Sequence, residues 1–237
     1  MDEKNIFCYT GRPDGLGNRI DQLISIQKYC EINNCKCIYL WNNRSFRKYD
    51  ICIKFKNIEI IKNFTKEMLK KICQVPLVRN KGYLVKYQFT FNIPNINYDT
   101  IIHIRATDRI VNHVHSEDFS TKNELVTLIN KTINYVNSEK SISTFTIVSD
   151  DISLKEYMKN KIHKKYVELS YNFDIHKDWL DFYYLTKPKN NVIMCSKFSS
   201  YSICASILGN KPLLIFKNSL KSESVCMLCN ADIKIID

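Results

Sequence analysis

The stretch Asp99-Thr-Ile-Ile-His-Ile-Arg-Ala-Thr-Asp-Arg-Ile-Val111 decides the fold. Residues 100–104 are apolar or β-branched apart from one histidine, which predicts a short strand buried on both faces of a sheet. Arg105 follows at the carboxyl end of this strand, where open α/β sheets bind their ligands. Its guanidinium suits a phosphate. A surface salt bridge between Arg105 and Asp108 would explain the same residues, so this stretch alone leaves both interpretations open.

Strands and helices are expected to alternate along the whole chain. The predicted strands are residues 5–10, 37–41, 58–61, 100–104, 143–148, 166–169, 191–195 and 212–216. The predicted helices are residues 20–30, 65–73, 121–133, 153–165, 177–186 and 202–208, the last followed by Gly209 as its C′ residue. Residues 42–57 suggest an irregular connection, and residues 76–98 a crossing between two lobes. The alternation predicts an α/β fold with parallel sheets, divided into residues 1–95 and 96–237.

Three of the five glycines lie in one loop, Gly11-Arg-Pro-Asp-Gly-Leu-Gly-Asn-Arg19. The chain therefore opens as strand, glycine-rich loop, helix and strand, which predicts a right-handed βαβ unit. Glycine at this density indicates a backbone that turns sharply or approaches another group closely. The loop is either a plain tight turn or a loop whose N–H groups face an anion or a sugar. Its spacing matches neither a dinucleotide fingerprint nor a P-loop.

Polar residues follow three predicted strands of the second lobe, at residues 105–109, 149–151 and 196–200. Parallel strands place their carboxyl ends at one edge of the sheet. The three stretches are therefore expected to meet in one crevice, which favours a ligand site over three unrelated strand ends.

The chain carries 35 lysines and arginines against 24 aspartates and glutamates, for a formal net charge of +11. A solvated, lysine-rich surface explains this excess, and so does an anionic partner such as a nucleotide, a nucleic acid or a membrane face. We expect a cytoplasmic protein with free thiols and no membrane span, because neither a signal peptide nor a long apolar run is evident. A zinc site built from Cys35, Cys37, Cys226 and Cys229 is the less favoured interpretation of the ten cysteines.

Four motifs, in chain order, resemble those of the fucosyltransferase superfamily, which includes the α1,6-fucosyltransferases of N-glycan core and Nod-factor type and the protein O-fucosyltransferases. Gly15-Leu-Gly-Asn-Arg19 resembles their first glycine-rich loop, and His103-Ile-Arg-Ala-Thr-Asp108 resembles their His-x-Arg-x-x-Asp motif. Residues 145–155 resemble the second motif, in which paired aspartates open a helix. Residues 181–185 and 194–201 resemble the third, so the resemblance spans nearly the full chain.

The resemblance implies a GT-B-like fold of two Rossmann-type lobes with a reduced N-terminal lobe on the acceptor side. It also implies a metal-independent, inverting transfer of fucose from GDP-fucose to a glycan hydroxyl. The residues implied in nucleotide-sugar binding are Gly15, Gly17, Asn18, Arg105, Asp108, Arg109, Asp150, Asp151, Asp181, Phe198, Ser199 and Ser200. Among them, Arg105 would bind the β-phosphate of GDP, Asp181 the guanine, and Ser200 with the backbone of residues 198–199 the diphosphate.

The implied catalytic residues are Arg105, with His103 shaping its site, and a general base whose identity stays open. In the core-fucosylating relatives, a candidate glutamate lies at a position that falls on or beside His113 here. We therefore expect His113 and Glu117 as the catalytic residues of that loop, with His115 and Asp118 as further candidates for a base near the acceptor hydroxyl.

We expect no bound metal, because fixed cations can stabilise a leaving diphosphate in its place. Arg105 and Arg109 supply such a positive field. The adjacent Asp150 and Asp151 could serve as a metal pair, although aspartates at the start of a helix are more often N-caps.

Two other functions remain open. The same scaffold could use another nucleotide sugar, since folds of this kind host many donors. The chain could also be a non-catalytic basic binding module, with aromatic and basic residues interleaved at 46–49 and 83–91. Neither stretch matches an RNA-binding motif, so we expect no nucleic-acid partner.

Overall fold

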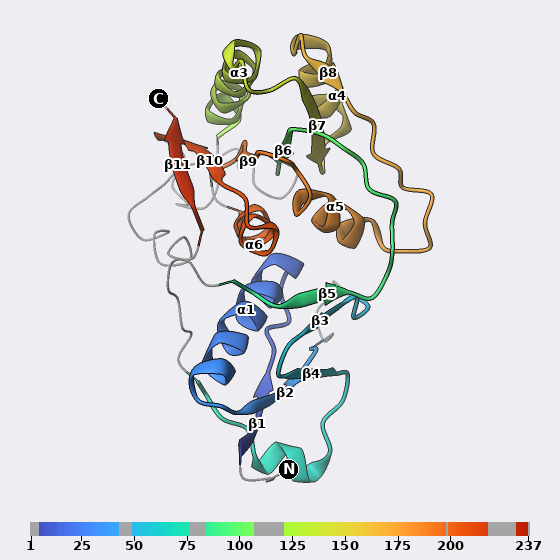
Figure 1. The fold of residues 1–237 in the computed structure, drawn as a ribbon, viewed down its shortest axis with the longest axis vertical. Coiled ribbons are helices and arrows are strands. Elements are labelled where there is room, and N and C mark those ends of the chain that lie inside the picture. Colours follow the sequence, from blue (N-terminus) through green and yellow to red (C-terminus); the bar gives the residue numbers. More distant parts are fainter. Residues whose placement is uncertain are drawn as a thin grey trace. The chain divides into compact units, whose positions relative to one another are not determined.

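The computed structural model describes residues 5–42, 49–75, 84–106, 121–197, 199–217 and 231–236 (Figure 1). The chain divides into two compact units, Met1–Pro94 and Asn95–Asp237. We call them the first and the second unit.

The first unit is built on a five-stranded sheet with the order β1-β2-β4-β3-β5. Its elements are β1 (Ile6–Thr10), α1 (Leu16–Ile32), β2 (Lys36–Leu40), β3 (Ile53–Phe55), β4 (Ile58–Ile61), α2 (Lys66–Lys70) and β5 (Tyr87–Phe89). Strands β1, β2 and β4 are parallel, as the opening βαβ pattern predicts. Strand β3 is antiparallel to both β4 and β5, so this sheet is mixed.

Strands β3 and β5 lie where the sequence suggests irregular connections. Residues Lys56 and Asn57 join β3 to β4 in a tight turn, and Asn57 adopts a left-handed backbone with φ of 64°. Asparagine tolerates this conformation better than most residues, which permits the reversal without a glycine. Three-residue strands are too short to show a periodic pattern, which is why the sequence does not reveal them.

Helix α1 begins four residues earlier than expected, directly in the glycine-rich loop. Gly15 is its N-cap, and its carbonyl accepts hydrogen bonds from the backbone N–H groups of Asn18 and Arg19. The apolar periodicity that marks the helix becomes clear only from Ile20 onward, so its first turn was assigned to the loop. Gly17 and Asn18 are therefore helical residues.

The second unit contains a six-stranded sheet with the order β11-β10-β9-β6-β7-β8, in which all neighbouring strands are parallel. Its strands are β6 (Thr100–Ile104), β7 (Thr144–Ser149), β8 (Lys165–Tyr166), β9 (Asn191–Met194), β10 (Leu213–Phe216) and β11 (Ile233–Ile236). Its helices are α3 (Lys122–Ser138), α4 (Ile152–Lys161), α5 (Lys177–Leu185) and α6 (Ser200–Gly209). The predicted α/β fold with a parallel sheet is confirmed.

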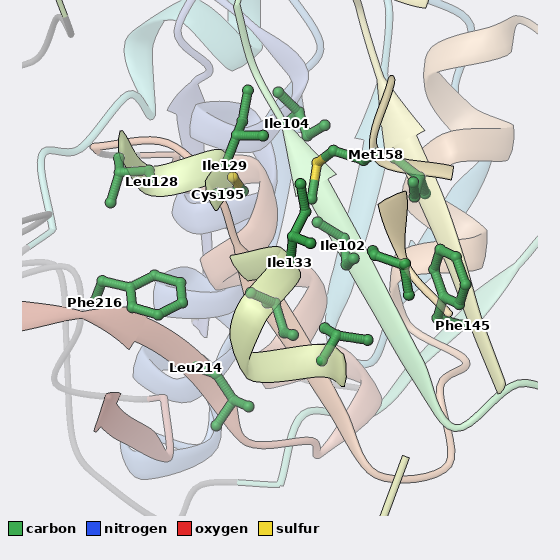
Figure 2. Close-up of a cluster of buried hydrophobic side chains, with 14 of the residues drawn as sticks. Ile102, Ile104, Leu128, Ile129, Ile133, Phe145, Met158, Cys195, Leu214 and Phe216 are labelled. Atoms are coloured by element: carbon green, nitrogen blue, oxygen red, sulfur yellow. The ribbon is translucent and has the colours of Figure 1, made fainter. Parts of the chain in front are cut away.

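Opposite faces of this sheet pack on different helices, because side chains alternate along each strand. Figure 2 shows Ile129 and Ile133 of α3 packed toward Ile102 and Ile104 of β6 in a cluster of buried apolar residues. The cluster also takes in Phe145, Met158, Cys195, Leu214 and Phe216. His103 lies between Ile102 and Ile104 in the strand and faces α6, on the other side of the sheet.

Several element boundaries differ from those predicted. Helix α6 begins at Ser200 and includes Gly209, and Asn210 takes the left-handed C-cap conformation with φ of 50°. Gly209 is needed for a different reason, because an added Cβ would lie 2.5 Å from the carbonyl oxygen of Thr186. Strand β8 has only two residues, and β11 was not predicted. No helix in the described ranges is long and apolar enough to cross a membrane.

Candidate functional site

The strand order of the second unit is that of a doubly wound nucleotide-binding fold. From β6 the chain moves outward through β7 and β8, then returns to place β9, β10 and β11 on the other side. A ligand crevice in such sheets lies beyond the carboxyl ends of the strands where the direction of winding reverses, here between β6 and β9. The polar segments that follow β6, β7 and β9 thus lie at neighbouring strand ends.

Arg105 leaves the sheet at the carboxyl end of β6, and its neighbourhood is fixed by Asp150. The backbone N–H of Ala106 donates a hydrogen bond of 2.7 Å to Oδ1 of Asp150. Arg105 itself is half-buried. Asp150 therefore joins the end of β7 to the end of β6 and anchors the backbone next to the guanidinium.

Asp151 caps helix α4. Its Oδ1 accepts a hydrogen bond of 3.0 Å from the backbone N–H of Leu154, and the Ser149 hydroxyl donates to the carbonyl of Asp151 at 2.9 Å. The N-cap interpretation of Asp151 is thus the one that the structure supports. The two adjacent aspartates have different local partners.

His103 is a buried, neutral imidazole. Its Nδ1 lies 2.5 Å from Oγ of Ser202 in α6, and its ring packs on that of Tyr201 with centroids 5.3 Å apart. Burial, together with the positive charges of Arg105 and Lys177, lowers the pKa of His103 to about 3. A histidine in this state does not act as a general base near neutral pH, but it connects β6 to α6.

The segment that leads from β9 into α6 brings Lys197, Ser199 and Ser200 to this edge. Ser199 is the N-cap of α6, and its hydroxyl accepts from the backbone N–H of Ser202 at 3.5 Å. Ser199 and Ser200 are both buried. Lys197 forms an ion pair of 2.8 Å with Glu124 of α3, and this lysine lowers the pKa of that carboxyl group.

Ser196 belongs to the polar segment of residues 196–200 that was expected at this edge, although it is not among the residues implied in nucleotide-sugar binding. Its side chain is 2% exposed, and its Oγ has no hydrogen-bond partner within the described part of the chain. Buried hydroxyls are nearly always hydrogen-bonded, so this unpaired hydroxyl at the end of β9 is a candidate for contact with a ligand. The only sequence signal was its place directly after the strand.

Asp181 is a buried carboxylate with both oxygens engaged. The hydroxyl of Tyr171 donates to Oδ1 at 2.6 Å, and Nζ of Lys177 lies 2.5 Å from Oδ2. Burial raises the pKa of Asp181, while Lys177 and Tyr171 oppose the shift. Burial and the neighbouring carboxylate raise the pKa of Tyr171. Lys177 is the exposed member of this cluster and the one that solvent can stabilise after displacement.

In the first unit, the glycine-rich loop is held by internal polar contacts. The Asn18 side-chain amide donates to Oδ2 of Asp14 at 2.9 Å, and Nε of Arg12 lies 2.9 Å from the same oxygen. Gly11 is the residue that permits close packing, since an added Cβ would lie 2.4 Å from the Tyr39 hydroxyl oxygen. Asn18, expected at the nucleotide sugar, thus orients Asp14 in this structure.

Several expected site residues lie outside the described residues: Asp108, Arg109, His113, His115, Glu117, Asp118, Phe198, Cys226 and Cys229. Among the residues that the structure does describe, no group of three or more His, Cys, Asp or Glu side chains could hold a metal ion. The eight cysteines in the described ranges are free thiols.

Comparisons with known proteins give matches only among solved structures. No protein-family model and no curated protein sequence matches the chain. The fucosyltransferase NodZ from Bradyrhizobium superimposes with a TM-score of 0.54 at 9% identity, over 92% of this chain and 96% of that one. NodZ α-1,6-fucosyltransferase co-crystallized with GDP gives 0.52 at 10% identity, over 90% and 95% of the two chains. The same enzyme soaked with GDP-fucose gives 0.50 at 11% identity, over 91% and 96%. The chain therefore has a fucosyltransferase-like fold, as the motif resemblance predicts.

Proposed function

We propose that this chain is a glycosyltransferase that moves fucose from GDP-fucose to a hydroxyl group of a glycan, with inversion and without a metal. The observation that carries the proposal is the carboxyl edge of the second unit, where Arg105, Ser196 and the start of α6 lie at the switch between β6 and β9. The fold likeness to a fucosyltransferase whose structures were obtained with GDP and GDP-fucose supports this choice of donor.

In this proposal the second unit binds the nucleotide sugar. Arg105 meets the β-phosphate, and the turn of residues 198–200 with the Ser196 hydroxyl receives the remaining diphosphate oxygens. Asp181 accepts hydrogen bonds from guanine, whose N1–H and N2–H₂ edge offers two donors to one carboxylate. Each oxygen of Asp181 has one partner in this structure and can accept a second hydrogen bond, so guanine can bind without displacing either, and the exposed Lys177 is the easier one to release.

The reaction would form one bond and break one at the anomeric carbon of fucose. The acceptor oxygen attacks C1, the bond between C1 and the β-phosphate oxygen breaks, and GDP leaves with both bonding electrons. A general base takes the proton of the acceptor hydroxyl. The negative charge that develops on the leaving phosphate is what a guanidinium and fixed N–H dipoles stabilise.

His103 is assigned a positioning role in this scheme. It is buried and neutral, and it touches Ser202 and Tyr201 of α6 rather than an open site. The base is proposed to come from the loop that contains His113 and Glu117. In this proposal the first unit binds the acceptor. The free thiols in the described ranges are compatible with a reducing, cytoplasmic setting.

A thermal-shift comparison of GDP, UDP and GDP-fucose tests the donor directly. A ligand that binds only the native protein raises its stability by about 2.7 kcal/mol at a hundred times its Kd, a shift of several degrees. GDP and GDP-fucose should stabilise the protein, and UDP should not. Equal shifts with all nucleotides would contradict the claim for guanine, and a hydrolysis panel of GDP and UDP sugars then identifies any other donor.

The same samples distinguish the proposal from a basic binding module. Polyanion binding that falls steeply with salt and is untouched by Arg105→Ala would favour such a module. Nucleotide binding that is lost in Arg105→Ala would exclude it.

A further inference from the structure

Arg19 is the largest charged side chain that is fully buried in the described part of the first unit, at 0% exposure. A buried guanidinium is costly unless its N–H groups are hydrogen-bonded, and apolar residues of similar volume are often equally stable in its place. Stability of the unit is therefore a weak reason for a cation at this position. Its contacts indicate what the cation does.

The guanidinium of Arg19 binds two successive carbonyl groups of the glycine-rich loop. Its Nε donates to the carbonyl of Asp14 at 2.8 Å, and its Nη2 donates to the carbonyl of Pro13 at 3.2 Å. The planar fork of arginine fixes both bonds at once, which the single ammonium of lysine cannot reproduce.

Two aromatic rings hold the guanidinium from the side. Its central carbon lies 5.0 Å from the centroid of Trp41 and 5.3 Å from that of Tyr49. The rings are fixed to each other, because the indole N–H of Trp41 donates to the carbonyl of Tyr49 at 2.9 Å. Cation–π attraction is strongest in desolvated sites such as this one.

The direction of the two carbonyls determines the direction of two N–H groups. The described peptide bonds are all trans, and in a trans peptide the C=O and N–H groups point to opposite sides. With the carbonyls of Pro13 and Asp14 turned inward to Arg19, the N–H groups of Asp14 and Gly15 are turned away from it. In the described ranges neither N–H donates a hydrogen bond.

We infer that Arg19 is a positioning residue for transfer, which keeps the N–H groups of Asp14 and Gly15 directed outward as a pair of donors. Successive N–H groups that point the same way form a concave site suited to an anionic or strongly polar oxygen. In the proposed function, which this inference takes as its basis, that oxygen belongs to a substrate of the transfer. Arg19 acts through the loop and does not touch the substrate.

The test compares Arg19→Lys and Arg19→Met with the unaltered chain, and Ile26→Ala as a matched control in the same helix. Lysine keeps the charge without the fork, and methionine keeps the apolar stem and volume. Ile26 is fully buried, so its truncation destabilises the first unit without touching the loop. In both Arg19 variants, kcat for transfer should fall about a hundredfold with the Kd for GDP within about twofold, the pattern of a lost transition-state donor pair.

A role limited to packing gives a different result. If the folded Arg19→Lys and Arg19→Met proteins keep their kcat, or if Ile26→Ala loses as much at temperatures where it is folded, the inference is wrong. If Arg19→Met does not fold, the kinetics of Arg19→Lys alone test the inference. Addition of free guanidinium to Arg19→Gly provides a second readout, because filling the space between the rings should restore kcat.

One measurement separates this inference from the proposed function. Residual dipolar couplings report the orientation of the Asp14 and Gly15 N–H vectors without any ligand. These couplings should change in Arg19→Lys and stay the same in Ile26→Ala. If they do so while the unaltered chain neither binds GDP nor transfers fucose, the positioning role stands and the proposed function fails. If the couplings do not change, the positioning role fails whatever the activity.

Discussion

Nδ1 of His103 lies 2.5 Å from Oγ of Ser202, so the central strand of the second unit is tied to the first turn of α6. The two residues are 99 positions apart in the chain. Arg105 follows His103 by two residues on one side of this contact, and Ser200 precedes Ser202 by two on the other. The proposed phosphate-binding groups are thus linked through a buried, uncharged imidazole.

Replacement of His103 by asparagine should remove part of the acid sensitivity of the protein. The pKa of the folded histidine is about 3, against 6.5 for an ordinary one, so the unfolded state binds more protons between these values. The free energy of unfolding therefore falls as the pH decreases below about 6.5, by up to about 1.4 kcal/mol per pH unit. Urea unfolding between about pH 7.5 and 5 measures this dependence. The free energy of unfolding should decline less steeply with pH in His103→Asn, whereas the exposed control His163→Asn should decline as steeply as the unaltered protein.

Arg105→Ala should abolish transfer and leave the fold intact. Arg105 is half-buried, directly follows β6 and is not part of the apolar cluster that holds the sheet together. Loss of a guanidinium that stabilises a leaving phosphate costs about 10² to 10³ in rate. Steady-state kinetics with GDP-fucose measures this loss, and Lys140→Ala, an exposed charge on the same unit, serves as the control. Full activity in Arg105→Ala would remove the central residue of the proposed site.

Ser196→Ala should separate ligand binding from stability. The Ser196 hydroxyl has no partner in the described part of the chain, so its removal should leave the free energy of unfolding unchanged or raise it by up to about 1 kcal/mol. If a ligand oxygen satisfies this hydroxyl, affinity for GDP should fall about tenfold. Calorimetry measures the affinity for GDP, and a urea titration measures the free energy of unfolding.

Ser206→Ala is the matched control for that experiment. Ser206 is equally buried in α6, but its hydroxyl donates to the carbonyl of Ile203 at 2.9 Å. This variant should lose stability and keep its affinity for GDP. If Ser196→Ala binds GDP as tightly as the unaltered protein does, GDP does not contact the Ser196 hydroxyl.

Asp181→Asn should weaken the distinction between GDP and inosine diphosphate, which lacks the 2-amino group of guanine. A carboxylate that accepts from both N1–H and N2–H₂ favours guanine by about 10-fold or more, and an amide cannot accept at both atoms. Competition binding of the two nucleotides measures the preference. If the ratio of the two affinities is the same in Asp181→Asn and in the unaltered protein, Asp181 does not recognise the base. The apo protein should also be less stable, since the variant breaks the ion pair with Lys177.

Chelation with EDTA should leave transfer within about twofold of its original rate, because the proposed mechanism relies on fixed cations in place of a Lewis acid. Assays before and after dialysis, with added manganese as a comparison, measure this directly. Strong inhibition that manganese reverses would show that a metal participates.

The long-range architecture of the second unit could be predicted because its strands are apolar, β-branched and separated by periodic helices. The convergence of Arg105, Asp150 and Ser199 at one edge followed from strand direction alone. The partners could not be predicted, since the contacts of Asp150 with Ala106 and of Asp181 with Tyr171 depend on loop geometry. Strand β3 and the antiparallel part of the first sheet were missed, because three residues contain too little periodicity.

Arg19 was missed for a related reason. A charged residue next to a glycine-rich loop is ordinarily exposed, and only the surrounding Trp41 and Tyr49 reveal that it is internal. The aromatic residues are distant in sequence, and the pattern of residues near the loop does not include them. The same limit applies to His103, whose burial and neutral state come from α6, a helix about a hundred residues later.

Helices α5 and α6 contact each other near both of their ends, and both carry residues of the proposed site. The hydroxyl of Tyr201, near the start of α6, donates to the carbonyl of Asp178 in the first turn of α5. At the opposite ends, Gly209 leaves no room for a Cβ beside Thr186. The two helices are thus clamped side by side at both ends, and the distance from the Asp181 carboxylate to the Ser199 turn is set by their spacing. In the proposed site, this spacing would set the distance between the groups that bind guanine and those that bind the diphosphate. A Gly209→Ala change would then increase the spacing at the ends of the helices farthest from the chemistry.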